Sequence, residues 1–177
     1  MIRKAIQADV PEIERVMRAS MAGLGAPSYD DAQVASAVRF IAVVDRQLID
    51  DGTYFVIEEG GQLVACGGWS GRAKLFSGPS EQDAVEGRLD PNVDAARIRA
   101  MFVDPAHARR GLGRRILEAA EADAARAGFR TFELMATLPG VPLYRACGYE
   151  EIERTVIELP DGARLECLRM QRRPIDA

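Results

Sequence analysis

The sequence predicts a mixed α/β fold, in which helices flank a mostly antiparallel sheet with the element order β-α-α-β-β-β-α-β-α-β-β. Three observations support this prediction. Apolar residues recur with strand spacing in some segments and with helix spacing in others. Short glycine turns join consecutive strands, which makes those pairs antiparallel. One strand-helix-strand crossover in the second half favours a parallel pair.

The first half opens with a short strand from Ile2 to Ile6. Asp9 is typical of a helix N-cap and Pro11 of a first helical turn, so a helix follows and ends in the loop 23–27. A second helix is predicted from Asp31 until the Asp51-Gly52 pair, on an apolar stripe of Val34, Val38, Ile41, Val44 and Leu48.

A hairpin follows. Residues 53–57 form a strand of β-branched and aromatic residues, Gly60-Gly61 turns the chain, and residues 62–66 return. The segment from Arg72 to about Ala95 carries only weak signals and is predicted to be a loop. A loop of this length in a compact domain is typically functional or mobile.

The second half alternates strands and helices. Apolar periodicity and turn residues predict a strand at 97–103, a helix behind Gly111-Leu112-Gly113 that stops at Gly128, a strand at 129–135, a short helix at 139–146, and two final strands at 150–159 and 163–170. No linker divides the chain, so we expect one domain over residues 1–177.

Composition narrows the class of protein. The 177 residues carry a net charge of −4, which argues against a nucleic-acid partner. No apolar run reaches the roughly 20 residues of a membrane span, and the N-terminus does not resemble a signal peptide. Three isolated cysteines suggest a reducing, cytoplasmic compartment. The single histidine, His107, excludes a multi-histidine metal site, and we expect no metal.

The segment 103–115 joins the end of a strand to the start of a helix, where backbone N–H groups lack helical partners and the helix dipole is positive. Gly111 and Gly113 let a ligand approach the backbone, and Arg109, Arg110 and Arg114 add charge. This pattern fits an anion site or, equally, an ordinary solvated surface. A Rossmann fingerprint lacks its third glycine, and a Walker loop is excluded because no Gly-Lys-Ser/Thr follows.

Two motifs together resemble the GNAT superfamily of N-acetyltransferases. Ala108-Arg109-Arg110-Gly111-Leu112-Gly113 is similar to the family's Gln/Arg-x-x-Gly-x-Gly/Ala signature, with Ala108 departing at its first position. Leu143-Tyr144-Arg145-Ala146-Cys147-Gly148-Tyr149 resembles its tyrosine landmark. The opening segments 2–5 and 8–11 also look like the family's first strand and helix. The likeness spans nearly the whole chain.

The resemblance implies a GNAT fold and an acetyl-coenzyme A-dependent N-acetyltransferase (EC 2.3.1.-) that passes acetyl to a primary amine by direct attack in a ternary complex. It implies that the coenzyme lies against Phe102, Val103, Arg109, Arg110, Gly111, Leu112, Gly113 and Arg114. The amine acceptor would be a small molecule or a peptide, with no nucleic acid or membrane as partner. A homodimer is compatible with it.

The same resemblance implies that Tyr144 is the general acid that protonates the departing thiolate. Glu133 is the weaker candidate for the general base, because it alternates away from Phe132 and Leu134 and could face the cleft. No carboxylate occupies the strand 97–103, where some members hold their base, and Thr137 stands where many carry Asn.

Two other classes of protein stay open at this point. A non-catalytic sensor would bind acetyl-coenzyme A and need the glycines but not an acid at position 144. A binder of another phosphate ligand would have no use for the tyrosine landmark at 143–149.

Overall fold

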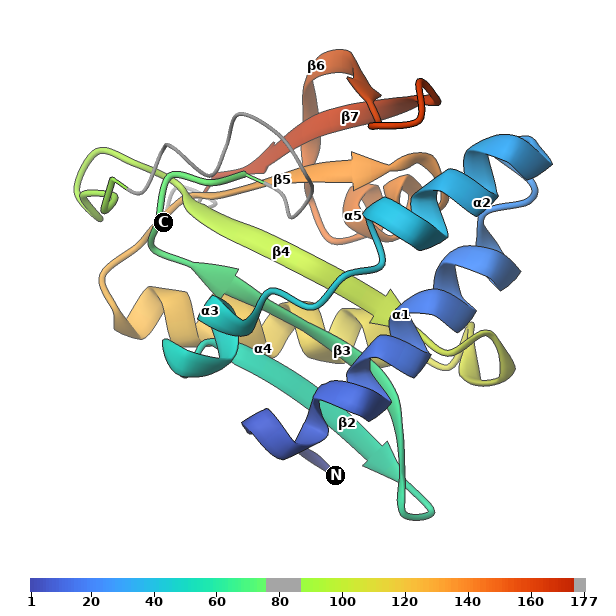
Figure 1. The fold of residues 1–177 in the computed structure, drawn as a ribbon. Coiled ribbons are helices and arrows are strands. Elements are labelled where there is room, and N and C mark those ends of the chain that lie inside the picture. Colours follow the sequence, from blue (N-terminus) through green and yellow to red (C-terminus); the bar gives the residue numbers. More distant parts are fainter. Residues whose placement is uncertain (76–86, 174–177) are drawn as a thin grey trace.

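The computed structural model describes residues 1–75 and 87–173. Its centre is a seven-stranded sheet in the order β1-β2-β3-β4-β5-β7-β6 (Figure 1). The strands are β1 (Ile2–Lys4), β2 (Tyr54–Glu59), β3 (Gln62–Ser70), β4 (Ala96–Val103), β5 (Phe132–Thr137), β6 (Glu150–Glu158) and β7 (Arg164–Arg172). Every neighbouring pair is antiparallel except β4–β5, which is parallel. The predicted mixed sheet is confirmed.

Helices cover both faces of this sheet (Figure 1). One face carries α1 (Val10–Leu24), α2 (Asp31–Phe40) and α3 (Arg46–Asp50), and the other carries α4 (Leu112–Arg126) and α5 (Val141–Ala146). Short 3-10 turns η1 (Gln7–Asp9), η3 (Pro105–His107) and η4 (Leu138–Gly140) connect them. Each face has its own apolar core, one around Ile13 and Met17 of α1 and one around Ile116 and Leu117 of α4.

The second predicted helix is wrong in one respect, because the stretch from Asp31 to Asp51 forms two helices. The first ends at Phe40, and the chain leaves helical geometry over Ile41-Ala42-Val43-Val44, where three of the four residues are β-branched and have lower helix propensity than alanine or leucine. Asp45 then caps α3 by accepting a hydrogen bond from the Gln47 N–H at 3.0 Å. Of the predicted apolar stripe, Leu48 is fully buried, whereas Val34, Val38, Ile41 and Val44 pack against the core while only partly buried.

Two smaller differences concern one strand bound and the predicted loop. The strand predicted from Phe129 begins at Phe132, and Phe129 instead packs edge-on against Trp69 with ring centroids 5.7 Å apart. Within the predicted loop 72–95, Arg72 and Arg88 form an isolated antiparallel bridge. Residues 76–86 of that prediction lie outside the described residues.

Candidate active site where two strands separate

The two central parallel strands pair at only one end. β4 and β5 are in register at Ala96–Phe132 and Arg97–Glu133, and no further pairing follows. β4 continues to Val103 on β3, while β5 continues to Thr137 on β7. Because each strand follows its other neighbour, the two separate towards their C-terminal ends and leave a gap in the middle of the sheet.

A bulge in β4 lies where the gap begins. The β3–β4 register changes between Cys66–Phe102 and Gly68–Arg99, so β4 holds one more residue than β3 over this stretch. Ala100 has a φ of 52°, a left-handed conformation that costs a non-glycine residue about 1 kcal/mol or more. The buried Tyr54 hydroxyl donates to the Ala100 carbonyl at 2.8 Å and holds this geometry. Burial raises the pKa of Tyr54, which therefore stays a donor. No sequence signal predicts this bulge.

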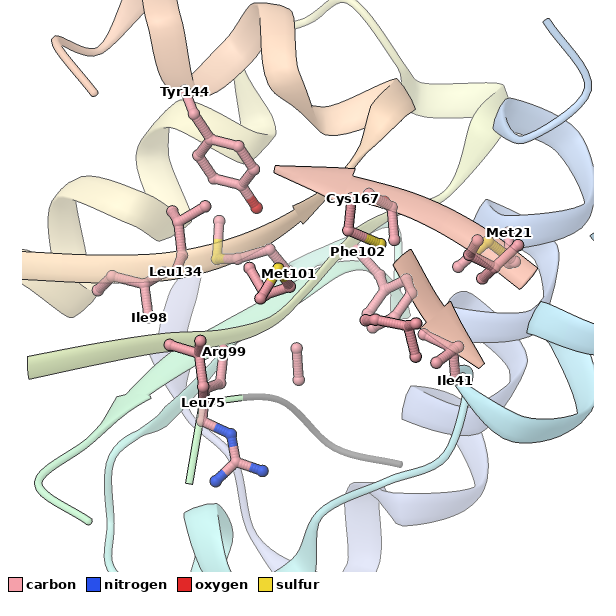
Figure 2. Close-up of a pocket in the computed structure, with 15 residues that line it drawn as sticks. Met21, Ile41, Leu75, Ile98, Arg99, Met101, Phe102, Leu134, Tyr144 and Cys167 are labelled. Atoms are coloured by element: carbon pink, nitrogen blue, oxygen red, sulfur yellow. The ribbon is translucent and has the colours of Figure 1, made fainter. Parts of the chain in front are cut away.

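A pocket lies at the gap and is lined by residues from both faces of the sheet (Figure 2). Ile98, Leu134 and Tyr144 belong to the core on the α4 face, whereas Leu165 and Cys167 belong to the core on the α1 face. The pocket holds about 720 Å³ of space, part of it open to solvent. It is lined by Met21, Ile41, Leu75, Ile98, Arg99, Ala100, Met101, Phe102, Leu134, Met135, Thr137, Tyr144, Ile157, Leu165 and Cys167.

Tyr144 is 8% exposed, and Figure 2 shows its ring entering the pocket with the hydroxyl directed inward. Its ring packs edge-on against Tyr149, with centroids 5.8 Å apart, and the Tyr149 hydroxyl is held by Glu121 Oε1 at 2.7 Å. Burial raises the pKa of Tyr144 above its usual range, with a smaller contribution from Cys147. The hydroxyl therefore keeps its proton at neutral pH. Within the described part of the chain, no protein group hydrogen-bonds it.

The junction that precedes α4 presents unpaired backbone N–H groups beside open space. Arg109 and Gly111 adopt left-handed φ angles of 63° and 76°, and the helix starts at Leu112. Among the described residues, the backbone N–H groups of 110–114 find no protein acceptor, and the first helical bond is from Arg115 to the Gly111 carbonyl at 3.1 Å. A Cβ on Gly111 would meet no protein atom within 4 Å. Unpaired donors beside open space fit a phosphate.

The missing side chain of Gly113 makes room for packing, while its backbone N–H stays a predicted coenzyme contact. A Cβ there would point at the Leu143 side chain at 2.9 Å and at Val103 at 3.6 Å, not into open space. The glycine therefore allows α5 to pack closely on the start of α4. This contact links the junction to the helix that carries Tyr144.

The other predicted coenzyme contacts surround the same junction. Arg110 pairs with Glu59 at 3.1 Å, and Arg114 Nη2 reaches the Ala146 carbonyl at 3.4 Å. The Leu112 side chain is buried in the core, which leaves only its backbone for a ligand. Phe102 lines the pocket. The Val103 N–H donates to Ser20 Oγ at 3.3 Å.

Glu133 lies outside this pocket. It is 4% exposed, and both carboxylate oxygens are engaged: Oε2 pairs with Arg97 at 3.0 Å and Oε1 with Arg169 at 2.6 Å. Its side chain points away from the core residues Phe132 and Leu134, as predicted. Both of its carboxylate oxygens, however, are paired with the two arginines. The structure thus brings Tyr144 close to the junction before α4. Glu133 lies at the opposite, closed end of the β4–β5 pair, where the two strands are in register.

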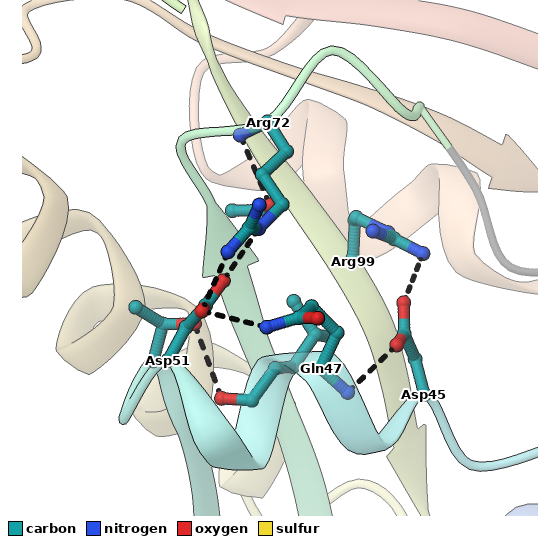
Figure 3. A network of polar contacts seen from close by, with 8 residues as sticks. Asp45, Gln47, Asp51, Arg72 and Arg99 are labelled. Carbon is teal, nitrogen blue, oxygen red and sulfur yellow. Dashed lines mark hydrogen bonds and ion pairs between the residues drawn. The ribbon is translucent and has the colours of Figure 1, made fainter. Parts of the chain in front are cut away.

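Arg99 is a pocket residue that the sequence reasoning missed. Its side chain is 2% exposed and donates to Asp45 Oδ2 at 2.5 Å. Figure 3 shows how Asp45 joins this arginine to the first turn of α3, whose Gln47 side chain contacts Asp51 and through it Arg72. The break at 41–45 places Asp45 here, so an uninterrupted helix could not have revealed the pair.

In residues 1–75 and 87–173, no cluster of three or more His, Cys, Asp or Glu side chains could hold a metal ion. No helix in those ranges is long and apolar enough to span a bilayer.

The site thus combines a separated central parallel strand pair, a helix start with unpaired backbone N–H groups and a tyrosine whose hydroxyl faces the pocket. The family model "Acetyltransferase (GNAT) domain" matches residues 50–151, more than half of the chain. The chain belongs to the GNAT acetyltransferase family. No curated protein sequence matches it.

Solved structures with the same fold cover almost the whole chain. A GCN5-related N-acetyltransferase from Rhodopseudomonas palustris aligns with a TM-score of 0.72 and 17% identity, over 98% of this chain and 94% of that one. The PaiA N-acetyltransferase of Thermoplasma acidophilum, solved with coenzyme A, gives 0.63 and 14% over 98% of each. The ribosomal-protein-S18-alanine N-acetyltransferase of Escherichia coli gives 0.60 and 18%, over 100% and 95%.

Proposed function

We propose that the protein is an N-acetyltransferase that transfers the acetyl group of acetyl-coenzyme A to a primary amine by direct attack in a ternary complex. The observation that carries the proposal is the Tyr144 hydroxyl, which faces a pocket at the β4–β5 gap beside the start of α4. Family membership and the coenzyme A complex of the Thermoplasma structure support it.

The coenzyme would be held mainly by backbone. The unpaired N–H groups of 110–114 would receive the pyrophosphate, and Arg109, Arg110 and Arg114 would add charge around it. The pantetheine arm would lie in the gap along Phe102 and Val103, where β4 lacks β5 as a partner. An extended arm can use strand edges of this kind as a peptide does.

Tyr144 would act on the leaving group. As the amine attacks the thioester carbon, the C–S bond breaks, and the thiolate needs a proton. The Tyr144 hydroxyl holds one, since its pKa is raised by burial, and it has no described protein acceptor that would compete for it. A positioned acid of this kind contributes about 10²- to 10⁴-fold to rate.

The amine must lose a proton before or during the attack. Glu133 as the base remains a prediction, and the geometry does not favour it, because Arg97 and Arg169 hold both its oxygens. Among the described lining residues there is no carboxylate and no imidazole. We therefore propose that water relays this proton to solvent.

A second candidate function is a sensor that binds acetyl-coenzyme A without turnover. The lack of a base among the described lining residues favours it. The unpaired Tyr144 hydroxyl favours catalysis. The single domain, the cytoplasmic location, the homodimer and the exclusion of nucleic-acid and membrane partners stay predictions.

The first test is ligand-linked stability. Acetyl-coenzyme A at about a hundred times its Kd should stabilise the fold by about 2.7 kcal/mol, measured as a raised Tm, while NAD and ATP at equal concentration should not. Release of free thiol with a panel of amines separates the candidates. A raised Tm without thiol release from any amine would favour the sensor.

A further inference from the structure

We infer, resting on the proposed function, that the amine acceptor is a monoamine with an apolar substituent and not a polyamine. The pocket walls carry this inference. Its described lining residues are apolar except for Arg99, Thr137, Tyr144 and Cys167. A ligand that fills such walls gains free energy from apolar surface and not from charge.

The amine acceptor and the coenzyme would enter from opposite faces of the sheet. The junction before α4 and Tyr144 belong to the α4 face, so the thioester would reach the gap from there. The remaining wall belongs to the other face: Met21 comes from α1, Ile41 from the end of α2, and Ile157 and Leu165 from β6 and β7. This second half of the pocket is where the body of the amine would lie.

The described wall of this half gives a second ammonium group no carboxylate partner. The charged side chain among the described lining residues is Arg99, a cation, and Figure 2 shows its guanidinium on the side of the pocket away from Tyr144. That guanidinium is already paired with Asp45 Oδ2 at 2.5 Å, so the described lining residues offer no carboxylate to the second ammonium of a diamine. Asp45 is poorly placed to pair with the second ammonium, because its two carboxylate oxygens already accept hydrogen bonds from Arg99 and from the Gln47 N–H (Figure 3). A buried ammonium without a partner is strongly unfavourable.

The experiment compares n-alkylamines from ethylamine to hexylamine with 1,6-diaminohexane and spermidine. Binding to the protein saturated with coenzyme A is measured by calorimetry, and turnover by thiol release with acetyl-coenzyme A. We expect affinity and kcat/KM to rise about fourfold per methylene until the pocket is full. Hexylamine should exceed 1,6-diaminohexane by at least about tenfold, since burying an unpaired charge costs more than a lost hydrogen bond.

A matched pair of variants tests whether the pocket wall determines the preference for monoamines over diamines. Ile157→Glu adds a carboxylate to the wall at a half-buried position, while Val156→Glu adds one to the neighbouring exposed residue of β6, which does not line the pocket. Ile157→Glu should shift the ratio of diamine to monoamine at least about tenfold towards the diamine, because the carboxylate pairs the second ammonium. Val156→Glu should leave the ratio unchanged.

The outcomes separate the two proposals. The expected binding order without thiol release from any amine would support the apolar pocket and overturn the transferase. Turnover that is flat across the alkylamines or highest with spermidine, or an absence of binding by every amine, would overturn the inference. Equal shifts in both glutamate variants would also overturn it.

Discussion

At their N-terminal ends β4 and β5 lie in register, and Glu133 fastens that end by pairing with Arg97 on β4 and Arg169 on β7. From Ile98 onward the same two strands are no longer paired, because each follows its other neighbour in the sheet. The closed end is buried and charged, with each carboxylate oxygen engaged. The open end has a left-handed alanine, a pocket, and a tyrosine hydroxyl without a described partner.

This contrast shows how one strand pair can serve two purposes. Ladder bonds and ion pairs at the closed end fix the distance between the strands. The open end gives up the bonds between β4 and β5, and the gap between the two strands then becomes available to a ligand. We therefore expect substitutions at the closed end to change stability first, and substitutions at the open end to change chemistry first.

The largest effect is expected at the open end. Tyr144→Phe keeps the ring against Tyr149 and removes the proton donor, so kcat should fall by about 10²- to 10⁴-fold while the affinity for acetyl-coenzyme A stays nearly unchanged. Steady-state kinetics and calorimetry measure the two. Tyr149→Phe is the control: its hydroxyl contacts Glu121 and does not line the pocket, so stability should fall but not turnover. Full activity of Tyr144→Phe would remove Tyr144 from the mechanism.

A smaller but global effect is expected at the closed end. Glu133→Gln keeps the shape but leaves Arg97 and Arg169 without their shared anion, which should lower the free energy of unfolding by about 3 kcal/mol. Chemical denaturation measures it. Glu153→Gln, whose exposed carboxylate lies 3.8 Å from Arg169, should cost less than about 1 kcal/mol.

The same variant decides between the two roles of Glu133. If it only fixes the strands, the pH profile of kcat keeps its shape. If Glu133 is the base, kcat should fall strongly in the variant, and the decrease of kcat at acidic pH should disappear from the profile. That second result would contradict the separation of roles between the two ends.

The smallest effect concerns the bulge at the boundary between the two ends. Tyr54→Phe removes the hydroxyl that donates to the Ala100 carbonyl, and an unsatisfied buried carbonyl costs about 1–2 kcal/mol. A relaxed bulge would also narrow the gap, so acetyl-coenzyme A should bind several times more weakly. Thermal unfolding and calorimetry check both. Unchanged affinity would mean that the bulge does not set the width of the gap.

Much of this architecture could be predicted from local patterns. The strand-to-helix junction at Gly111 follows from its glycines and arginines, and Tyr144 follows from its landmark. The bulge at Ala100 could not be predicted, because its partner Tyr54 is 46 residues away and an alanine carries no turn signal. The Arg99–Asp45 pair could not be predicted for a similar reason. It forms only because the predicted helix is interrupted at 41–45, which positions Asp45 beside Arg99. Local periodicity reports burial, whereas these features depend on distant contacts.

Gly113 has a further consequence for how the sequence of this chain can change over time. Its missing side chain lets Leu143 approach the start of α4, one residue before Tyr144. A larger residue at 113 would have to be accompanied by a smaller one at 143, or the tyrosine would shift with its helix. Positions 113 and 143 should therefore vary as a pair among descendants of this sequence, although neither side chain lines the pocket.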